Sequence, residues 1–517
     1  MTWDAIVIGS GFGGVMAAWP LVQAGQRVLM LERGGWVGRG PENWNDRSAG
    51  LVTPSYNRES EYAVSAGNRR YEAGAWNCVG GQSVFYGGAS YRFRETDFVA
   101  NPDIVADSGA DWPFRYADIE PYYSWAEQLL GVSGEAASGE PWRSIPYPQP
   151  AAPLSDSSRV IADAAMRVGL TPSRIPLAIS FDGNGSARPC MRCGTCDGYA
   201  CAAEAKNDLA TGIIPRLIQQ GMTLRPNTVC TRLMRAGSRI TAVECVDRIS
   251  GARHTIEGDR VILGAGALAT PHLLLASNLS RINPAGDRVG RYLTRHRNAI
   301  VFGVFARQPN PTRAFDKQIA LLDLYDGAGS IQQLTPPIGL VKSYLPWGLR
   351  SAGARFVSQA SGLIIIAEDQ PRFENGVDVD WTRTDRFALP RLTVRHSYSA
   401  RDERAAATLI AVARRVLRAA GARMSLVHPI ETFSHALGTV RMGPDAATSP
   451  LDADGCYRGL DNLFVADGSA LPRSAGLNPS LTIAANALRI GAGIARFTPV
   501  RRGRALRTFA PNYTLQS

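Results

Sequence analysis

The first 33 residues carry the feature that most restricts the fold: a strand, a glycine-rich turn, a helix and a second strand. An apolar segment at 5–8 leads into the turn, and a second one at 28–31 is followed by an acidic residue. Glycines at this spacing allow a tight turn, close backbone approach to a pyrophosphate and close packing of helix on strand, while the helix N-terminus offers N–H groups to an anion. The pattern predicts an α/β dinucleotide-binding domain, with Glu32 accepting hydrogen bonds from ribose hydroxyls. The expected contacts from this segment are Gly9, Gly11, Phe12, Gly14, Glu32 and Arg33.

The composition indicates a globular protein of enzyme size. A chain of 517 residues with 45% hydrophobic residues can bury a large core and is long enough for more than one domain. No apolar run is long enough to span a bilayer, and the first strand leaves no room for a signal peptide before it, so we expect no membrane span and a cytoplasmic location. The net charge of +11 is scattered, apart from arginines 501, 502, 504 and 507. Without interleaved aromatic residues, this cluster favours a basic C-terminal tail at 501–517, solvated or in a subunit contact, over a nucleic-acid site.

The turn alone does not show whether the bound dinucleotide is NAD or FAD, but later segments distinguish the two. The informative ones are 76–89, 111–123, 260–275, 434–443, 462–469 and 476–482. In this order they resemble the glucose-methanol-choline family of FAD-dependent oxidoreductases over nearly the whole chain. The segment at 111–123 is similar to the sugar-oxidising branch of that family. The resemblance implies noncovalent FAD, because the loop at 76–89 contains no histidine to which a flavin could be attached.

The same resemblance implies further cofactor contacts. A flavin-contacting loop would supply four of them, a strand-to-helix bend near the phosphate arm a fifth, and a later strand end two more. For Asp467, at that strand end, a turn-capping role without ligand contact is the alternative. A final helix over 480–496 would point its N-terminus at the pyrimidine side of the flavin, where it stabilises negative charge. These expected contacts are Gly81, Ser83, Gly87, Gly88, Ala265, Asp467, Gly468, Asn478, Pro479 and Ser480.

His435 is the candidate catalytic base. Oxidation of an alcohol to a carbonyl requires hydride transfer to flavin N5 and removal of the hydroxyl proton, and imidazole titrates in the right range for the second task. By itself a histidine at this position would be read as a core residue, but its segment matches the family's. Asn478 stands where the family has its second catalytic residue, and it can hold the substrate oxygen but cannot act as a base. The other five histidines, at 254, 272, 296, 396 and 428, are expected to be structural or exposed.

Four of the eight cysteines lie within twelve residues, at positions Cys190, Cys193, Cys196 and Cys201. Three thiolates at this spacing can hold an iron–sulfur cluster or another metal, although the last spacing is longer than in ferredoxins and no proline follows. The alternatives are buried thiols or a local disulfide, the latter less natural in a reducing cytoplasm. The sequence leaves cluster and no cluster open.

The expected fold class is α/β: a discontinuous Rossmann-like FAD-binding domain plus an α+β substrate domain built on a β-sheet. The FAD-binding domain would comprise residues 1–110, 205–300 and 430–500, and the substrate domain 111–204 and 301–429. The expected reaction is FAD-dependent oxidation of a primary or secondary alcohol on a sugar, cyclitol or glycoside, aminoglycoside-type intermediates included, with oxygen, a quinone or a redox protein as electron acceptor. The alternatives are a sterol or other apolar alcohol as substrate, and an electron-transfer or redox-sensing flavoprotein that uses the cysteines.

Overall fold

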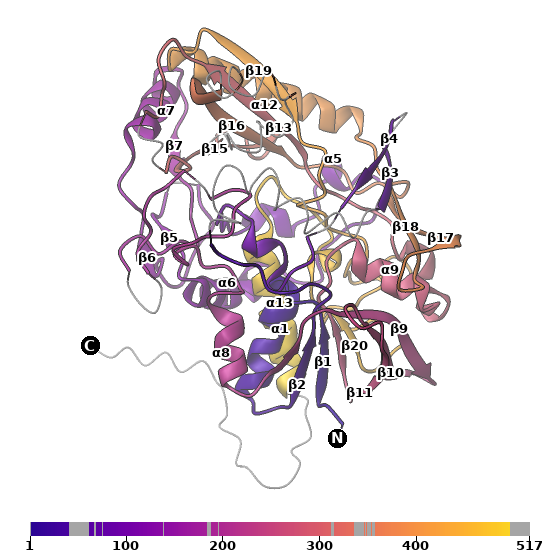
Figure 1. The fold of residues 1–517 in the computed structure, drawn as a ribbon. Coiled ribbons are helices and arrows are strands. Elements are labelled where there is room, and N and C mark those ends of the chain that lie inside the picture. The colour runs from indigo at the N-terminus through magenta and orange to yellow at the C-terminus, as the bar shows by residue number, and fades with distance from the viewer. Residues whose placement is uncertain are drawn as a thin grey trace.

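A five-stranded parallel sheet lies in the lower part of the view in Figure 1, around β1, β2 and β20. The computed structural model describes residues 2–40, 62–66, 69–74, 76–137, 139–183, 188–194, 196–311, 315–334 and 357–496, with single positions at 346, 348 and 353. The strand order is β20-β12-β1-β2-β8. The strands are β1 (Ala5–Ile8), β2 (Val28–Leu31), β8 (Thr223–Arg225), β12 (Val261–Leu263) and β20 (Leu463–Val465). Every residue of β1, β2 and β12 is buried, as expected for parallel strands covered on both faces. The expected Rossmann-like fold class is confirmed.

Two helices pack together along one side of this sheet, and an antiparallel layer lies beside the other (Figure 1). The helices are α1 (Phe12–Gln23) and α13 (Ser480–Arg496), and the layer consists of β9 (Thr228–Ala236), β10 (Arg239–Asp247) and β11 (Arg253–Glu257). Close packing of α1 depends on glycine, because a Cβ on Gly14 would overlap the carbonyl oxygen of Gly9. The helix expected over 480–496 is present with those bounds.

A six-stranded antiparallel sheet forms the second core, in the order β19-β13-β16-β15-β14-β7. Its strands are β7 (Pro172–Arg174), β13 (Arg297–Val304), β14 (Ile319–Leu321), β15 (Gly329–Leu334), β16 (Ala360–Ala367) and β19 (Met424–Pro429). Helices α7 (Asp156–Arg167) and α12 (Ala400–Ala419) cover one face. On that face Val301 pairs with Leu363, and both pack under Leu409 in one buried cluster.

A four-stranded sheet, β17-β18-β3-β4, joins segments that are far apart in the chain. It consists of β3 (Tyr62–Ala66), β4 (Arg69–Ala73), β17 (Gly376–Thr384) and β18 (Pro390–Arg395). Further α-helices in the described ranges are α5 (Pro102–Val105), α6 (Tyr116–Leu130), α8 (Ile213–Gln219) and α9 (Ala269–Ala276). Strands β5 (Ser133–Gly134) and β6 (Gln149–Pro150) pair with each other. Short 3-10 helices lie at Gly81–Val84, Glu95–Phe98, Leu279–Ile282, Gly286–Arg288 and Gly468–Ala470.

The expected domain boundaries stay a prediction. The strands of the parallel sheet come from the ranges expected for the FAD-binding domain, whereas α6, from the range expected for the substrate domain, packs on α13. The basic tail at 501–517 lies outside the described residues. Within the described part of the chain, no helix is long and apolar enough to cross a membrane.

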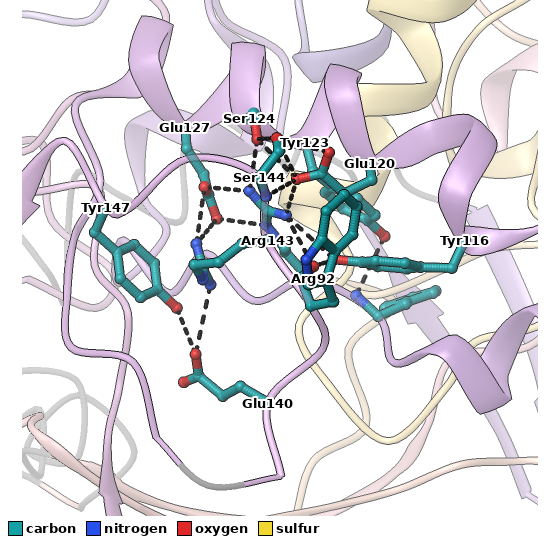
Figure 2. A network of polar contacts seen from close by, with 12 residues as sticks. Arg92, Tyr116, Glu120, Tyr123, Ser124, Glu127, Glu140, Arg143, Ser144 and Tyr147 are labelled. Atoms are coloured by element: carbon teal, nitrogen blue, oxygen red, sulfur yellow. Dashed lines mark hydrogen bonds and ion pairs between the residues drawn. The ribbon is translucent and has the colours of Figure 1, made fainter.

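A buried ionic network fastens α6 to the loop that precedes it (Figure 2). Arg92 donates to both carboxylate oxygens of Glu127, at 2.9 and 2.7 Å, and to Glu120 at 2.8 Å. The side chains of all three are at most 2% exposed. Arg143 donates to Glu127 from the other side at 3.0 Å. Tyr123, on the same helix, shares a 2.7 Å hydrogen bond with Thr482, so the network also reaches α13.

Replacing Arg92 with Met should lower the free energy of unfolding by about 3–5 kcal/mol, because two buried carboxylates lose their main cation. Urea denaturation followed by circular dichroism measures the change. The matched control is Arg27→Met: Arg27 pairs with Asp4 at the surface, and exposed pairs contribute little. Equal stability of the Arg92→Met variant and the wild type would contradict a stabilising role for the network.

Candidate active site

A cavity of about 300 Å³ lies at the turn that follows β1. Its wall includes residues from the N-terminal turn, the end of β12, the end of β20 and the segment around residue 435. The expected site residues that line it are Gly9, Gly11, Phe12, Glu32, Arg33, Gly81, Ala265, His435, Asp467, Gly468 and Pro479. Segments more than 400 residues apart in sequence therefore meet at one cavity.

The other expected residues are not part of the lining of this cavity. Gly14 packs closely against Gly9 of the turn. Ser83 holds its loop by donating to Gly80 O and accepting from Leu209 N–H. Gly88 O accepts from the backbone N–H of Ala178, and Ser480 Oγ donates to Ala89 O. These bonds fix the loop at 80–89 against its neighbours.

Glu32 ends β2 at the cavity and is 6% exposed. Its Oε2 accepts from the backbone N–H and the hydroxyl of Ser10, and its Oε1 accepts from the N–H of Gly34. Burial raises the pKa of Glu32 above its usual value. The carboxylate thus braces the glycine turn, and Oε1, which accepts this single bond, has an acceptor position for a further donor.

His435 lines the cavity and contacts a second histidine that sequence reasoning did not select. The Nδ1 atoms of His435 and His296 lie 3.0 Å apart, and the two rings are nearly perpendicular. Desolvation, together with the nearby His296 and Lys317, lowers the pKa of His435 to about 3. The ring is therefore neutral across the physiological range. Nothing in the local sequence around His296 indicated this contact, which joins residues 139 positions apart.

The remaining four histidines are split between core and surface. His272 lines the cavity with its Nε2 2.6 Å from Pro390 O, and His396 is buried near Asp369. His254 on β11 and His428 on β19 are exposed.

Asn478 lies two residues before the start of α13. Its side-chain Oδ1 is buried without a hydrogen-bond partner. Four residues earlier, the carbonyl oxygen of Ser474 lies 2.9 Å from His296 Nε2, so this segment runs past the histidine pair. An unpaired buried acceptor at such a place is suited to a ligand that brings a donor.

Two family models account for most of the chain. Residues 4–298 match the N-terminal part and residues 373–487 the C-terminal part of the family described as GMC oxidoreductase. The chain belongs to the GMC oxidoreductase family. It is an FAD-dependent oxidoreductase that acts on alcohols.

Individual relatives match over nearly the full length. The chain is 32% identical to 6'''-hydroxyparomomycin C oxidase of Streptomyces lividus and 31% identical to paromamine 6'-oxidase of Streptomyces fradiae, in each case over 95% of this chain and 91% of the relative. Among solved structures, pyridoxine 4-oxidase from Mesorbium loti is similar with a TM-score of 0.69 at 19% identity, over 96% of this chain and all of that chain. The last likeness concerns the fold.

The residues of this GMC oxidoreductase fit the FAD of the family. The first N–H groups of α1 have no intrahelical acceptors and lie in the cavity wall, where a pyrophosphate would bind. Gly11 leaves the space above it open, since a Cβ there would approach the surrounding atoms no closer than 3.9 Å. The adjacent turn at 265–268 lines the same space. Together they form a cradle in which backbone can approach a phosphate group closely.

The carboxylate of Asp467 is fully engaged within the protein. Its Oδ1 accepts from the backbone N–H and hydroxyl of Ser469, and its Oδ2 accepts from Gly266 N–H and the hydroxyl of Thr270. These four bonds use the acceptor capacity of a carboxylate. They favour the capping role considered for Asp467 and leave its backbone, with that of Gly468, to face a cofactor.

Two buried lysines support the loop that contains Gly87. Lys206 Nζ donates to the carbonyl oxygens of Val84 and Tyr86 in the loop, and to those of Cys196 and Tyr199 across from it. Lys317 pairs with Asp197 at 2.7 Å, and a Cβ on Gly87 would overlap both partners. Glycine is therefore required at position 87, because any side chain there would collide with this ion pair. Sequence reasoning found the loop but neither lysine.

The four clustered cysteines surround a separate small cavity beside Lys206. No disulfide joins any of the four. Within the described residues, no group of three or more His, Cys, Asp or Glu side chains is placed to hold a metal ion. The arrangement brings the cysteines together without forming a ligand set.

Replacing Gly14 with Ala should displace α1 from the turn, since the added methyl group overlaps the carbonyl oxygen of Gly9. We expect a loss of about 1–3 kcal/mol in stability and of most of the bound FAD. The ratio of flavin to protein absorbance in purified enzyme measures the second effect. Gly493→Ala on α13 is the matched control, because a Cβ there meets nothing within 4 Å. Full flavin content in the Gly14→Ala variant would contradict the assigned phosphate turn.

Proposed function

We propose that this chain oxidises a primary or secondary hydroxyl group of an aminoglycoside-type or related glycoside to a carbonyl, with His435 as the catalytic base. The observation that carries the proposal is the place of His435 in the wall of the cofactor cavity, where its ring contacts His296. The substrate class is supported by the two Streptomyces relatives, whose names describe oxidases of 6'''-hydroxyparomomycin C and of paromamine.

The proposed work of His435 is to remove the hydroxyl proton. Burial lowers the pKa of this ring, so the ring is unprotonated at working pH and its lone pair is available for that proton. Bound FAD supplies the acceptor for the hydride that leaves the carbinol carbon. The carbon–hydrogen and oxygen–hydrogen bonds break, and a carbon–oxygen double bond forms.

Asn478 is proposed to orient the substrate. Its Oδ1 is buried and unpaired, so a hydroxyl group of the substrate can donate to it. A carboxamide has no basic nitrogen, which leaves proton removal to His435. A hydroxyl group has only one proton, so the group that donates to Asn478 Oδ1 would be a neighbour of the reacting hydroxyl, whose own proton goes to His435.

Replacing His435 with Ala should lower the rate of alcohol oxidation by about 10²–10⁴-fold while FAD stays bound, because the general base is lost. Anaerobic flavin bleaching by paromamine, followed at the flavin absorbance, measures the rate. His254→Ala is the control, since that histidine is exposed on β11. Unchanged bleaching in the His435→Ala variant would remove His435 as the base, whereas a wild-type flavin that paromamine does not bleach would support a redox-sensing or electron-transfer flavoprotein instead.

We infer that the four clustered cysteines hold no iron–sulfur cluster. The support is their arrangement: they line one small cavity, but no three of the described donor side chains are placed around a common centre. Without a cluster, the electrons would pass directly to an acceptor that reaches the flavin, such as oxygen or a quinone.

A cytoplasmic location stays a prediction, which cell fractionation would check.

Anaerobically purified protein should show a flavin spectrum with far less than one iron per chain. Iron and acid-labile sulfide assays on the same preparation measure this directly. The test variant replaces Cys190, Cys193 and Cys196 with Ser. The control variant is Cys456→Ser, because Cys456 lies outside the segment of clustered cysteines. Stoichiometric iron that disappears only in the triple variant would overturn the inference and make the segment an electron conduit.

A further inference from the structure

We propose that His296 is a positioning residue that holds His435 in the tautomer with its proton on Nδ1 and its Nε2 free. This inference rests on the proposed role of His435 as base. A catalytic base needs one ring nitrogen that carries no proton. His296 would explain why that nitrogen is Nε2 of His435.

The first step is the contact between His296 and Ser474. The carbonyl oxygen of Ser474 lies 2.9 Å from His296 Nε2. A carbonyl oxygen can only accept a hydrogen bond, so the proton of the neutral His296 ring must be on Nε2. Its Nδ1 is then an acceptor.

The second step assigns the donor and acceptor nitrogens of His435. Its Nδ1 lies 3.0 Å from His296 Nδ1. Because the latter is an acceptor, His435 must donate from Nδ1, and its own Nε2 carries the lone pair. The opposite tautomer would place two bare nitrogens against each other and leave both without a donor.

The third step concerns the rigidity of the pair. Asp369 accepts the backbone N–H of His296 at 3.0 Å and the hydroxyl of Ser474 at 2.9 Å, so one carboxylate holds both the ring and its acceptor. Tyr398 donates to the carbonyl oxygen of His296 at 2.9 Å. The backbone of His296 has φ +63°, a left-handed conformation that is uncommon for residues other than glycine. The surrounding bonds maintain it, as expected where a side chain must point in one direction.

In the reaction, the hydroxyl proton of the substrate goes to His435 Nε2, and the electron pair of the carbon–hydrogen bond leaves as hydride to FAD. The His435 ring then carries two protons and one positive charge. Its Nδ1–H still donates to His296, so the charged ring keeps its orientation through the step.

Two substitutions of His296 separate hydrogen bonding from packing. Met fills similar volume without an acceptor, whereas Asn places Oδ1 near the position of Nδ1 and tolerates a left-handed backbone. We expect His296→Met to lower kcat by about 10²-fold or more with little change in KM, as for loss of the correct tautomer elsewhere. His296→Asn should recover at least about a tenth of the wild-type kcat. His254→Met, at an exposed position, should match the wild type.

A direct measurement does not depend on any His296 variant folding. Protein labelled with ¹⁵N in its histidine rings reports which nitrogen carries the proton, and the His435 signals are those absent from the His435→Ala variant. The inference requires a protonated Nδ1 and an unprotonated Nε2 for His435 in the wild type. A protonated Nε2, or full kcat in a folded His296→Met variant that contains FAD, would overturn it. If His435→Ala itself remains active, the proposed function fails, and these results then no longer bear on catalysis.

Discussion

The fold depends on one close backbone contact, between the turn after β1 and the end of β12. Gly9 donates its N–H to Leu31 O at 2.8 Å, and Gly264 donates to Ile8 O at 2.8 Å, so the turn is held by both neighbouring strands. A Cβ on Gly264 would overlap the backbone of Gly14. Because these strands approach so closely, the N-terminus of α1, the 265–268 turn and Asp467 converge on one small volume. The cofactor cavity is the space that this convergence leaves.

The reactive end of the cavity is assembled in a different way, by a buried carboxylate. Asp369 follows β16 of the antiparallel sheet, yet it holds the backbone of His296 and the hydroxyl of Ser474 from two other segments. A low-dielectric interior strengthens such charge-assisted bonds and makes each partner costly to remove. The antiparallel sheet therefore contributes to the geometry of His435, although His435 lies in a loop outside that sheet.

Local patterns in the sequence predicted the local features of the structure. The turn glycines, the helix that begins at Ser480 and the place of His435 all have short-range signals, such as glycine spacing or a motif around a histidine. His296 and Arg92 lack such signals, because their partners lie 139 and 28–35 positions away and only the folded chain brings them together. Asp467 was found for its place, but its four internal bonds could not be read from residue types. The loop at 80–89 was likewise recognised, whereas the lysines beneath it were not.

One of those two lysines, Lys206, occupies a site that arginine cannot fill, although arginine is the predominant basic residue of this chain. The chain contains only three lysines among its 56 basic residues, and Lys206 and Lys317 are both buried. Lys206 is surrounded by four carbonyl oxygens at 2.7–3.2 Å, an environment for a compact ammonium with three donors. A planar guanidinium is larger and directs its donors in a fork, so it does not fit inside such a ring of acceptors. At position 206 the enclosing backbone therefore sets the shape of the cation, and lysine meets it where arginine does not.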